Sequence, residues 1–332
     1  MAFISLALIL LALGLVLVGL MMLLMARGIL QPPRMTDWKA IDRLHRLSPG
    51  DLGLTFENQN FTVRDARTHR PLKIAGWWIA HPAAAGRCAI LIHGYADAKV
   101  GAIAWAPLLH ELGLNILAID LRAHGDSGGF FSTGGFLERD DLNQVIDQLL
   151  AARADEARQL ILFGISLGAA VAAATAARRE DINAVILESP FADYRRIVTA
   201  HVSALGMPTG VVLRGALRLA AVLSGADFDQ VRPATTIRQT RAPLLIILGG
   251  DDELLEEQDV AALEQAVQNR ASDAGPAEII TADNATHLMA IHVDPAGYAA
   301  RISSFIEHAL ADREPHLARR EHTPGWVFGT SD

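Results

Sequence analysis

Cysteine is nearly absent from this chain, with one among 332 residues, and basic residues are outnumbered by acidic ones, 29 to 37. A single cysteine excludes a disulfide within the monomer. The place of Cys88 in the apolar run 88–92 predicts a buried strand residue rather than a nucleophile or a metal ligand. The formal charge of -8 provides no basic face that could follow a phosphate backbone. We therefore expect no nucleic-acid partner.

Charge is also missing from the N-terminus, where no ionisable side chain lies between Phe3 and Met25. As a helix this segment would be about 35 Å long, enough to cross a hydrocarbon core of about 30 Å. A cleaved signal sequence usually has a basic start and an Ala-x-Ala-like cleavage site, and this chain offers only Leu24-Met25-Ala26. We predict that residues 1–27 form a retained single-pass transmembrane anchor.

Basic residues follow the apolar segment, whereas none precedes it. They are Arg27, Arg34, Lys39, Arg43 and Arg46. The positive-inside rule then places the C-terminal domain in the cytoplasm. A secreted or periplasmic product is the alternative.

The rest of the chain divides into three parts. Prolines at positions 32 and 33 interrupt any continuous helix after the anchor, so residues 28–50 are interpreted as a juxtamembrane connector. We expect the globular domain over residues 51–311 and a peripheral tail over residues 312–332. On this division, a purified domain without the first thirty or so residues should suffice for activity.

Short apolar runs alternate with longer helical segments through the globular part. This alternation predicts an α/β fold with a mainly parallel central sheet of about eight strands, covered by helices on both faces. The runs that we interpret as strands are 61–64, 72–79, 89–92, 115–119, 160–163, 184–187, 244–248 and 277–280.

The pentapeptide Gly164-Ile165-Ser166-Leu167-Gly168 lies between a strand-like run, 159–163, and an alanine-rich helical run, 169–179. This context is typical of a nucleophile elbow, in which a serine on a sharp strand-to-helix turn projects its oxygen above the sheet. The flanking glycines lack a Cβ, which allows a tight turn and a close helix-to-strand approach. Ser166 is therefore the candidate nucleophile.

A serine hydroxyl needs a base, held by a third group, before it becomes a strong nucleophile. One late strand-like run leads into Asp251 and Asp252, and either carboxylate could be the required acid or a solvated loop or cap residue. The last strand-like run is followed by His287, the candidate base, with His292 as its rival.

An oxyanion hole needs backbone N–H groups aimed at the negative charge of the tetrahedral intermediate. Leu167, immediately after the candidate nucleophile, is expected to supply one amide. The second is assigned to Tyr95, in the loop His93-Gly94-Tyr95 after the strand-like run 89–92. His93 itself is interpreted as a residue that shapes this loop through hydrogen bonds.

Taken together, these motifs resemble those of the α/β-hydrolase-fold serine hydrolases, in the family's order over roughly residues 55–310. They comprise His93-Gly94-Tyr95, the segment 120–128, Gly164-Ile165-Ser166-Leu167-Gly168, Glu188-Ser189-Pro190-Phe191, Gly249-Gly250-Asp251-Asp252 and His287.

More narrowly, the chain is similar to the membrane-anchored prolyl-oligopeptidase-like and Bem46-like group. In that group the acid commonly falls three residues after a glycine that ends its strand, so Gly249 implies Asp252 rather than Asp251. Members often carry a histidine before that glycine, where this chain has Leu248.

The resemblance implies hydrolysis of an ester, thioester or amide through an acyl-enzyme, with no cofactor and no metal. An acyltransferase, a serine peptidase and a catalytically silent, membrane-tethered binding module are the alternatives. Helical material within residues 190–242 either forms a small cap over the pocket or packs against the sheet. As a cap, its apolar underside would favour a lipophilic acyl substrate, which the nearby membrane would supply. The oligomeric state is left open.

Several other charged residues receive structural roles. Asp120 and Arg122 are expected to pair with each other and fix a loop beside the site. Glu188, Asp140 and Asp141 are interpreted as loop or helix-surface carboxylates that the mechanism does not need.

Overall fold

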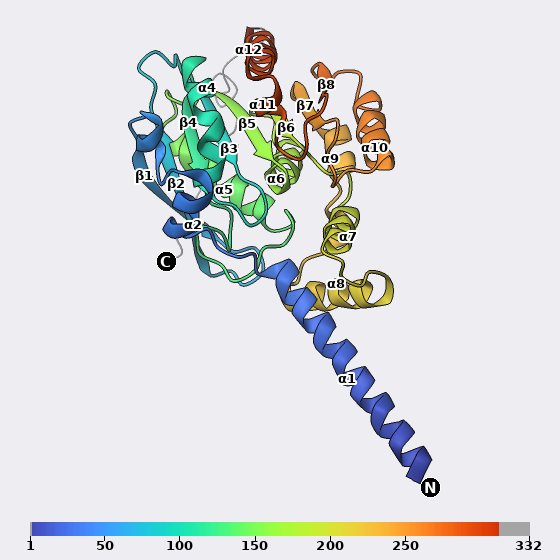
Figure 1. Cartoon of the computed structure of the whole chain (residues 1–332). Helices are drawn as coiled ribbons and strands as arrows, with labels where there is room; N and C mark the ends of the chain where they lie inside the picture. The colour runs from blue at the N-terminus through green and yellow to red at the C-terminus, as the bar shows by residue number, and fades with distance from the viewer. Residues whose placement is uncertain (1, 312–332) are drawn as a thin grey trace, which may run out of the picture.

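The computed structural model describes residues 2–311, and within them eight strands form one sheet in the order β1-β2-β4-β3-β5-β6-β7-β8 (Figure 1). Strand β2 runs antiparallel to β1 and β4, and every pair from β4 to β8 is parallel. The predicted fold class is therefore confirmed. The strands are β1 (Glu57–Arg64), β2 (Pro71–Ile79), β3 (Arg87–Ile92), β4 (Asn115–Ile119), β5 (Gln159–Ile165), β6 (Ile182–Glu188), β7 (Leu244–Gly249) and β8 (Ala277–Ala282).

Helices cover both faces of the sheet. Apolar side chains of α5, α6, α9 and α10 belong to the core on one face, and those of α3, α4 and α12 to the core on the other. The side chains of β5 alternate between these cores, with Leu162 in the first and Phe163 in the second. The helices are α1 (Ala2–Leu30), α2 (Asp37–Leu44), α3 (Lys99–Ala102), α4 (Ala106–Glu111), α5 (Glu138–Ala152), α6 (Leu167–Ala176), α7 (Tyr194–Ala204), α8 (Gly210–Ser224), α9 (Pro233–Gln239), α10 (Glu257–Gln268), α11 (Ala290–Val293) and α12 (Pro295–Ala311).

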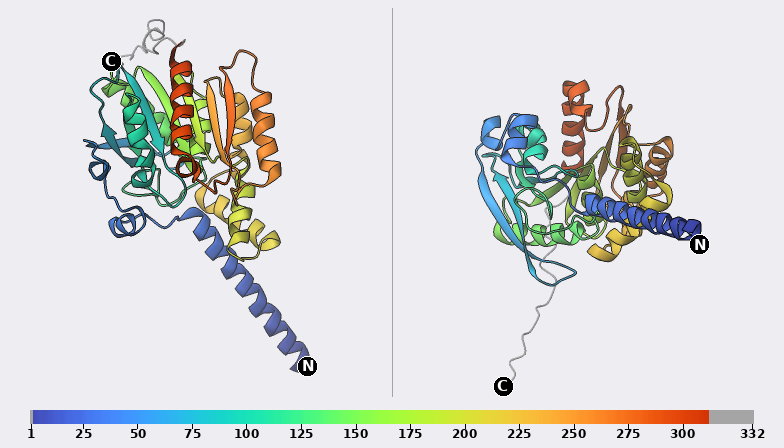
Figure 2. Two further views of the ribbon diagram at one scale, coloured as in Figure 1. Left: turned by 45° about the horizontal axis from the view of Figure 1, so that its top comes forward. Right: turned by 60° about the horizontal axis from the view of Figure 1, so that its bottom comes forward.

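Helix α1 extends away from the domain (Figure 1, Figure 2) and is long and apolar enough to cross a membrane. It ends at Leu30, so the anchor boundary expected at residue 27 lies inside the helix. Its last residues do not stand free, because Met25, Ala26, Ile29 and Leu30 are buried in a third apolar core. The structure therefore argues against the expectation that a domain without the first thirty residues would suffice.

This third core holds α1 against a small cap formed by α7 and α8, which contribute Val202 and Leu217, respectively. Helix α9 packs elsewhere, because its buried Ile237 belongs to a core of the sheet. The helices within residues 190–242 are thus divided between the third core and a core of the sheet, and their role as a cap over the pocket stays a prediction. The predicted tail, residues 312–332, lies outside the described residues.

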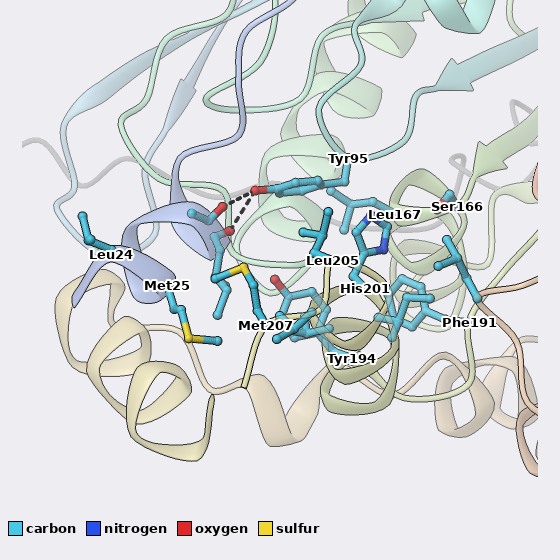
Figure 3. A pocket seen from close by; sticks show the side chains of 16 residues that line it. Leu24, Met25, Tyr95, Ser166, Leu167, Phe191, Tyr194, His201, Leu205 and Met207 are labelled. Carbon is cyan, nitrogen blue, oxygen red and sulfur yellow. Dashed lines mark hydrogen bonds between the residues drawn. The ribbon is translucent and has the colours of Figure 1, made fainter. Parts of the chain in front are cut away.

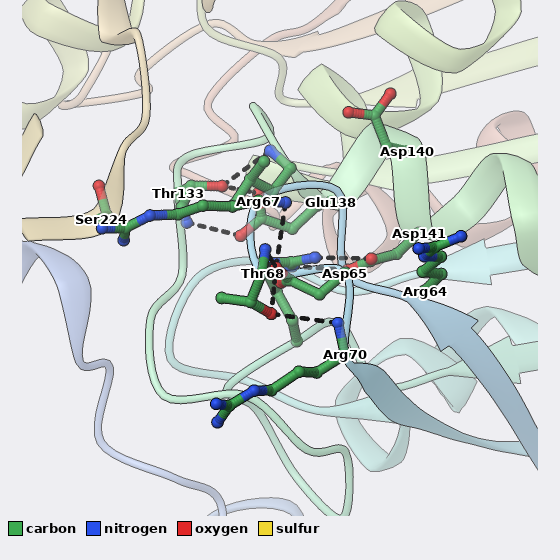
Figure 4. A network of polar contacts seen from close by, with 12 residues as sticks. Arg64, Asp65, Arg67, Thr68, Arg70, Thr133, Glu138, Asp140, Asp141 and Ser224 are labelled. Atoms are coloured by element: carbon green, nitrogen blue, oxygen red, sulfur yellow. Dashed lines mark hydrogen bonds and ion pairs between the residues drawn. The ribbon is translucent and has the colours of Figure 1, made fainter.

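The buried charged side chains pair differently from the sequence expectation. Arg122 binds Asp141 at 2.6 Å and Asp65 at 2.8 Å, two carboxylates that Figure 4 shows in one network of polar contacts. Asp120 instead accepts a hydrogen bond from Lys99 at 2.6 Å. Asp141 and Lys99 belong to α5 and α3, which cover opposite faces of the sheet, so Asp120 and Arg122 point away from each other. Asp141 is correspondingly buried rather than on the helix surface.

Replacing Arg122 by methionine would leave two shielded carboxylates without their cation. We expect the free energy of unfolding to fall by about 3–5 kcal/mol, because an unpaired buried charge is strongly destabilising. Urea unfolding in detergent micelles measures this loss. Arg301→Met is the control, since it removes an exposed pair with Glu278 and should cost less than about 1 kcal/mol. Equal losses in the two variants would contradict the prediction.

Candidate active site

The residue at the centre of the site is Ser166, on the turn between β5 and α6. Its backbone has φ 52° and ψ -110°, a conformation that costs a non-glycine residue about 1–3 kcal/mol and that clusters at functional sites. The Ser166 amide donates to the carbonyl oxygen of Glu188 at 2.9 Å, which ties the turn to the end of β6.

The glycines on either side of Ser166 make this turn sterically feasible. A Cβ on Gly168 would overlap the carbonyl oxygen of Ile92 at the end of β3, and a Cβ on Gly164 would overlap the backbone of Gly168. Only residues without a side chain allow β3, β5 and α6 to approach this closely. The local sequence therefore fixes where the serine oxygen stands.

His287 connects Ser166 to a buried carboxylate. Its Nε2 lies 3.1 Å from the Ser166 Oγ, and its Nδ1 lies 2.7 Å from Asp252 Oδ2. The Asp252 side chain is 1% exposed, and its second oxygen accepts a hydrogen bond from the Leu254 amide at 3.0 Å. The three side chains come from loops after β5, β7 and β8, so the parallel sheet brings them together at one edge.

The rival residues lie elsewhere. Asp251 and His292 have exposed side chains. His93 is fully buried and accepts a hydrogen bond from the Leu121 amide at 2.9 Å, as expected for a residue that shapes a loop. Burial holds the pKa of His93 well below its usual value, so this ring stays neutral.

Two backbone amides adjoin the serine. Leu167 is the first residue of α6, where an N–H group has no acceptor within its own helix. Within residues 2–311, neither this amide nor that of Tyr95 donates to a backbone carbonyl. Both residues border the cavity that contains Ser166. The amides of Leu167 and Tyr95 thus stay the predicted donors of an oxyanion hole.

A cavity of about 260 Å³ opens beside Ser166 (Figure 3). Its walls are mainly apolar, and they include Phe191, Ile197 and Val202 from the cap region and Met25 from α1. A hydrocarbon group fits such a lining, since few polar groups there would lose their hydration.

One residue near the site departs from its expected position. Glu188 is fully buried at the end of β6, where the Tyr298 hydroxyl donates to its Oε2 at 2.7 Å. The Trp105 Nε1–H in turn donates to that hydroxyl at 2.7 Å. From the sequence, Glu188 is interpreted as a loop or helix-surface carboxylate, whereas it is the last and buried residue of β6. The apolar run 184–187 directly before Glu188 could have indicated that β6 extends through this residue and buries its side chain.

Comparisons with known proteins add the family. A family model described as the alpha/beta hydrolase family matches residues 89–301. The uncharacterized protein YqkD of Bacillus subtilis is 26% identical over 222 residues, which cover 66% of this chain and 70% of YqkD. YfhR of Escherichia coli (strain K12) is 32% identical over 159 residues, which are 45% of this chain and about half, 52%, of YfhR.

Solved structures share the fold. The Pyrococcus furiosus esterase Pf2001 has a TM-score of 0.67 and 22% identity, covering 84% of this chain and 98% of the esterase. Est1E of Butyrivibrio proteoclasticus, solved with ferulic acid bound, has a TM-score of 0.56 and 19% identity, covering 76% of this chain and 100% of Est1E. The narrower likeness to the Bem46-like group stays a prediction. Because the family match covers more than half of the sequence, and the strands and the turn at Ser166 agree with it, the chain belongs to the alpha/beta hydrolase family.

Proposed function

We propose that the protein is a serine hydrolase that cleaves an ester, thioester or amide through an acyl-enzyme. The observation that carries this proposal is the continuous pair of contacts from Asp252 through His287 to Ser166, at a strained strand-to-helix turn. The same three residue types are the ones by which hydrolases turn a hydroxyl into a nucleophile.

The contacts define which ring nitrogen carries the proton. An ionised carboxylate only accepts hydrogen bonds, so the His287 Nδ1–H donates to Asp252. Nε2 is then free to accept the Ser166 hydroxyl proton. Asp252 holds the ring in this tautomer and stabilises the imidazolium that forms when the proton arrives.

The reaction follows from this arrangement in two halves. As His287 Nε2 takes the hydroxyl proton, Ser166 Oγ bonds to the substrate carbonyl carbon, and the amides of Tyr95 and Leu167 donate to the resulting oxyanion. Collapse of the intermediate expels the leaving group, which receives the proton from His287. Water then adds to the acyl-enzyme by the same proton route, releasing the acid and restoring Ser166.

The raised pKa of Glu188 is consistent with Asp252 as the acid of the proposed triad. Burial, which is opposed by the hydrogen bond from Tyr298 and assisted by the negative charge of Asp252, raises the pKa of Glu188 to about 8. Glu188 is therefore mostly protonated at neutral pH, so it adds no second negative charge beside the Asp252 carboxylate that contacts His287. Two ionised carboxylates this close in a buried place would oppose each other.

The cavity favours an acyl substrate with a hydrocarbon chain over a peptide, since a peptide would bring polar backbone groups against apolar walls. An acyltransferase would use the same acyl-enzyme and differ only in the acceptor. Product analysis with an added alcohol or thiol distinguishes transfer from hydrolysis.

Labelling of the serine tests the nucleophile. A small fluorophosphonate should modify the full-length protein, and Ser166→Ala should abolish the labelling because the attacking oxygen is gone. Ser272→Ala, which alters an exposed loop serine, is the matched control and should label like the wild type. Undiminished labelling of Ser166→Ala would refute the assignment.

The two adjacent aspartates can be told apart by substitution. Asp252→Asn should lower kcat by about 10³–10⁴-fold, because an amide favours the wrong imidazole tautomer. Asp251→Asn should leave kcat nearly unchanged, since that side chain is exposed. Steady-state hydrolysis of a short activated ester measures both variants, and a larger loss in Asp251→Asn would overturn the choice.

The buried Glu188 predicts a pH-dependent stability. Between its ordinary pKa of 4.5 and its folded pKa of about 8, the folded state holds a proton that the unfolded state has released. This group therefore lowers the free energy of unfolding as pH rises, by up to about 1.4 kcal/mol per pH unit. Glu188→Gln lacks this loss, so its stability relative to wild type should increase with pH across that window. Urea unfolding in micelles at several pH values measures the difference, and a pH-independent difference would contradict the prediction.

A further inference from the structure

The outer wall of the cavity beside Ser166 belongs partly to α1. Leu24, Met25, Gly28 and Ile29 border the cavity together with residues of α7 and the turn at Ser166 (Figure 3). The Tyr95 hydroxyl donates to the carbonyl oxygen of Gly28, with a longer contact of 3.5 Å to that of Ile29. The end of α1 is thus bonded to the same residue whose amide is assigned to the oxyanion hole.

We propose that the last two turns of α1 form one wall of the acyl-chain site, so that the chain of a membrane-dissolved acyl ester or thioester passes from the bilayer to Ser166. This inference rests on the proposed serine hydrolase function. It makes α1 a retained anchor, because removal of a cleaved signal sequence would take away both the wall and part of the third apolar core.

The length of α1 agrees with this position. The segment Phe3–Leu30 has 28 residues and is about 42 Å long as a helix. About 20 residues suffice to cross the hydrocarbon core. The surplus of roughly eight residues at the C-terminal end corresponds to the part of α1 that packs against the cap and borders the cavity.

Several apolar residues that border the cavity are also exposed on the surface. Leu24 of α1 and Leu205 and Met207 of the α7–α8 connection all border the cavity, yet they are 59%, 69% and 39% exposed. Val211, at the start of α8, is a further apolar residue with 69% exposure. In a bilayer interface these side chains would lie in lipid rather than water. Removing this apolar surface from water stabilises the association of the domain with the membrane.

An acyl chain in this site should show a steep dependence on length. Each methylene that leaves water for an apolar wall is worth about three- to fourfold in binding. If the chain is seated before the chemical step, kcat/KM rises by a similar factor per methylene until the cavity is full. A peptide or a short polar ester would gain nothing from the α1 wall.

Two glycines of α1 provide a matched test. Gly28 borders the cavity, Gly14 does not, and a Cβ at either position would meet no atom within 4 Å. Full-length Gly28→Phe and Gly14→Phe are compared on acetate, butyrate, octanoate and dodecanoate esters in micelles. Gly28→Phe should lower kcat/KM for dodecanoate by at least about tenfold and for acetate by less than about twofold, since the ring fills the chain site and not the turn at Ser166. Gly14→Phe should keep the wild-type profile.

The outcome separates this inference from the proposed function. Labelling by a small fluorophosphonate reports the nucleophile in every variant, whatever the chain site does. If Gly28→Phe labels normally but retains the wild-type chain-length profile, or loses acetate and dodecanoate hydrolysis equally, the α1 wall is refuted.

A binding measurement covers the case in which no ester is hydrolysed. Fluorescent dodecanoic acid should bind Ser166→Ala and Ser166→Ala/Gly14→Phe alike, and Ser166→Ala/Gly28→Phe at least about tenfold more weakly. Equal binding by all three would refute the site. The intact mass of protein extracted from membranes should include residues 24–30, and a chain cleaved within or after this segment would refute retention of the wall.

Discussion

The backbone turn at Ser166 is the constraint on which the rest of the site depends. Its positive φ is maintained because glycines at 164 and 168 leave no side chain between β5, α6 and the end of β3. Its amide is fixed to the carbonyl oxygen at the end of β6. The hydroxyl consequently stands at the carboxyl edge of the sheet, where the loops after β7 and β8 also end. The parallel pairing of β6, β7 and β8 also brings the loops that carry Asp252 and His287 to this edge, which accounts for their contacts with each other and with Ser166.

Much of this arrangement could be predicted from the sequence, because it is encoded locally. Most strands contain a short apolar run bounded by polar or turn residues, and Ser166 lies between such a run and an alanine-rich helix. The order of strand, loop and acid or base then restricts the choice to a few positions. Asp252 and Asp251 are adjacent, however, and only the folded chain distinguishes them geometrically, because Asp252 is buried and contacts His287 whereas Asp251 is exposed.

What escaped prediction depends on contacts between distant segments. Arg122 pairs with Asp141 and not with Asp120, because the loop turns the two side chains toward opposite faces of the sheet. Glu188 is buried because β6 continues one residue beyond its apolar run. The place of Met25 in a core and in a cavity wall has no local signal at all, since every residue in that segment also satisfies the pattern of a membrane helix. A uniformly apolar sequence does not indicate which end of the helix contacts lipid and which end packs against protein.

Tyr95 connects helix α1 with the candidate active site. Its hydroxyl binds the carbonyl oxygen of Gly28, near the end of α1, and burial raises its pKa to about 12, so it remains a donor throughout the physiological pH range. Tyr95 also borders the cavity beside Ser166, and its backbone amide is the one assigned to the oxyanion hole. A displacement of α1 is therefore transmitted through one side chain to a group assigned to the oxyanion. On the proposed mechanism, the packing of α1 against the cap therefore has two effects. It shapes the acyl-chain site, and it helps to position the Tyr95 amide that donates to the oxyanion in the transition state.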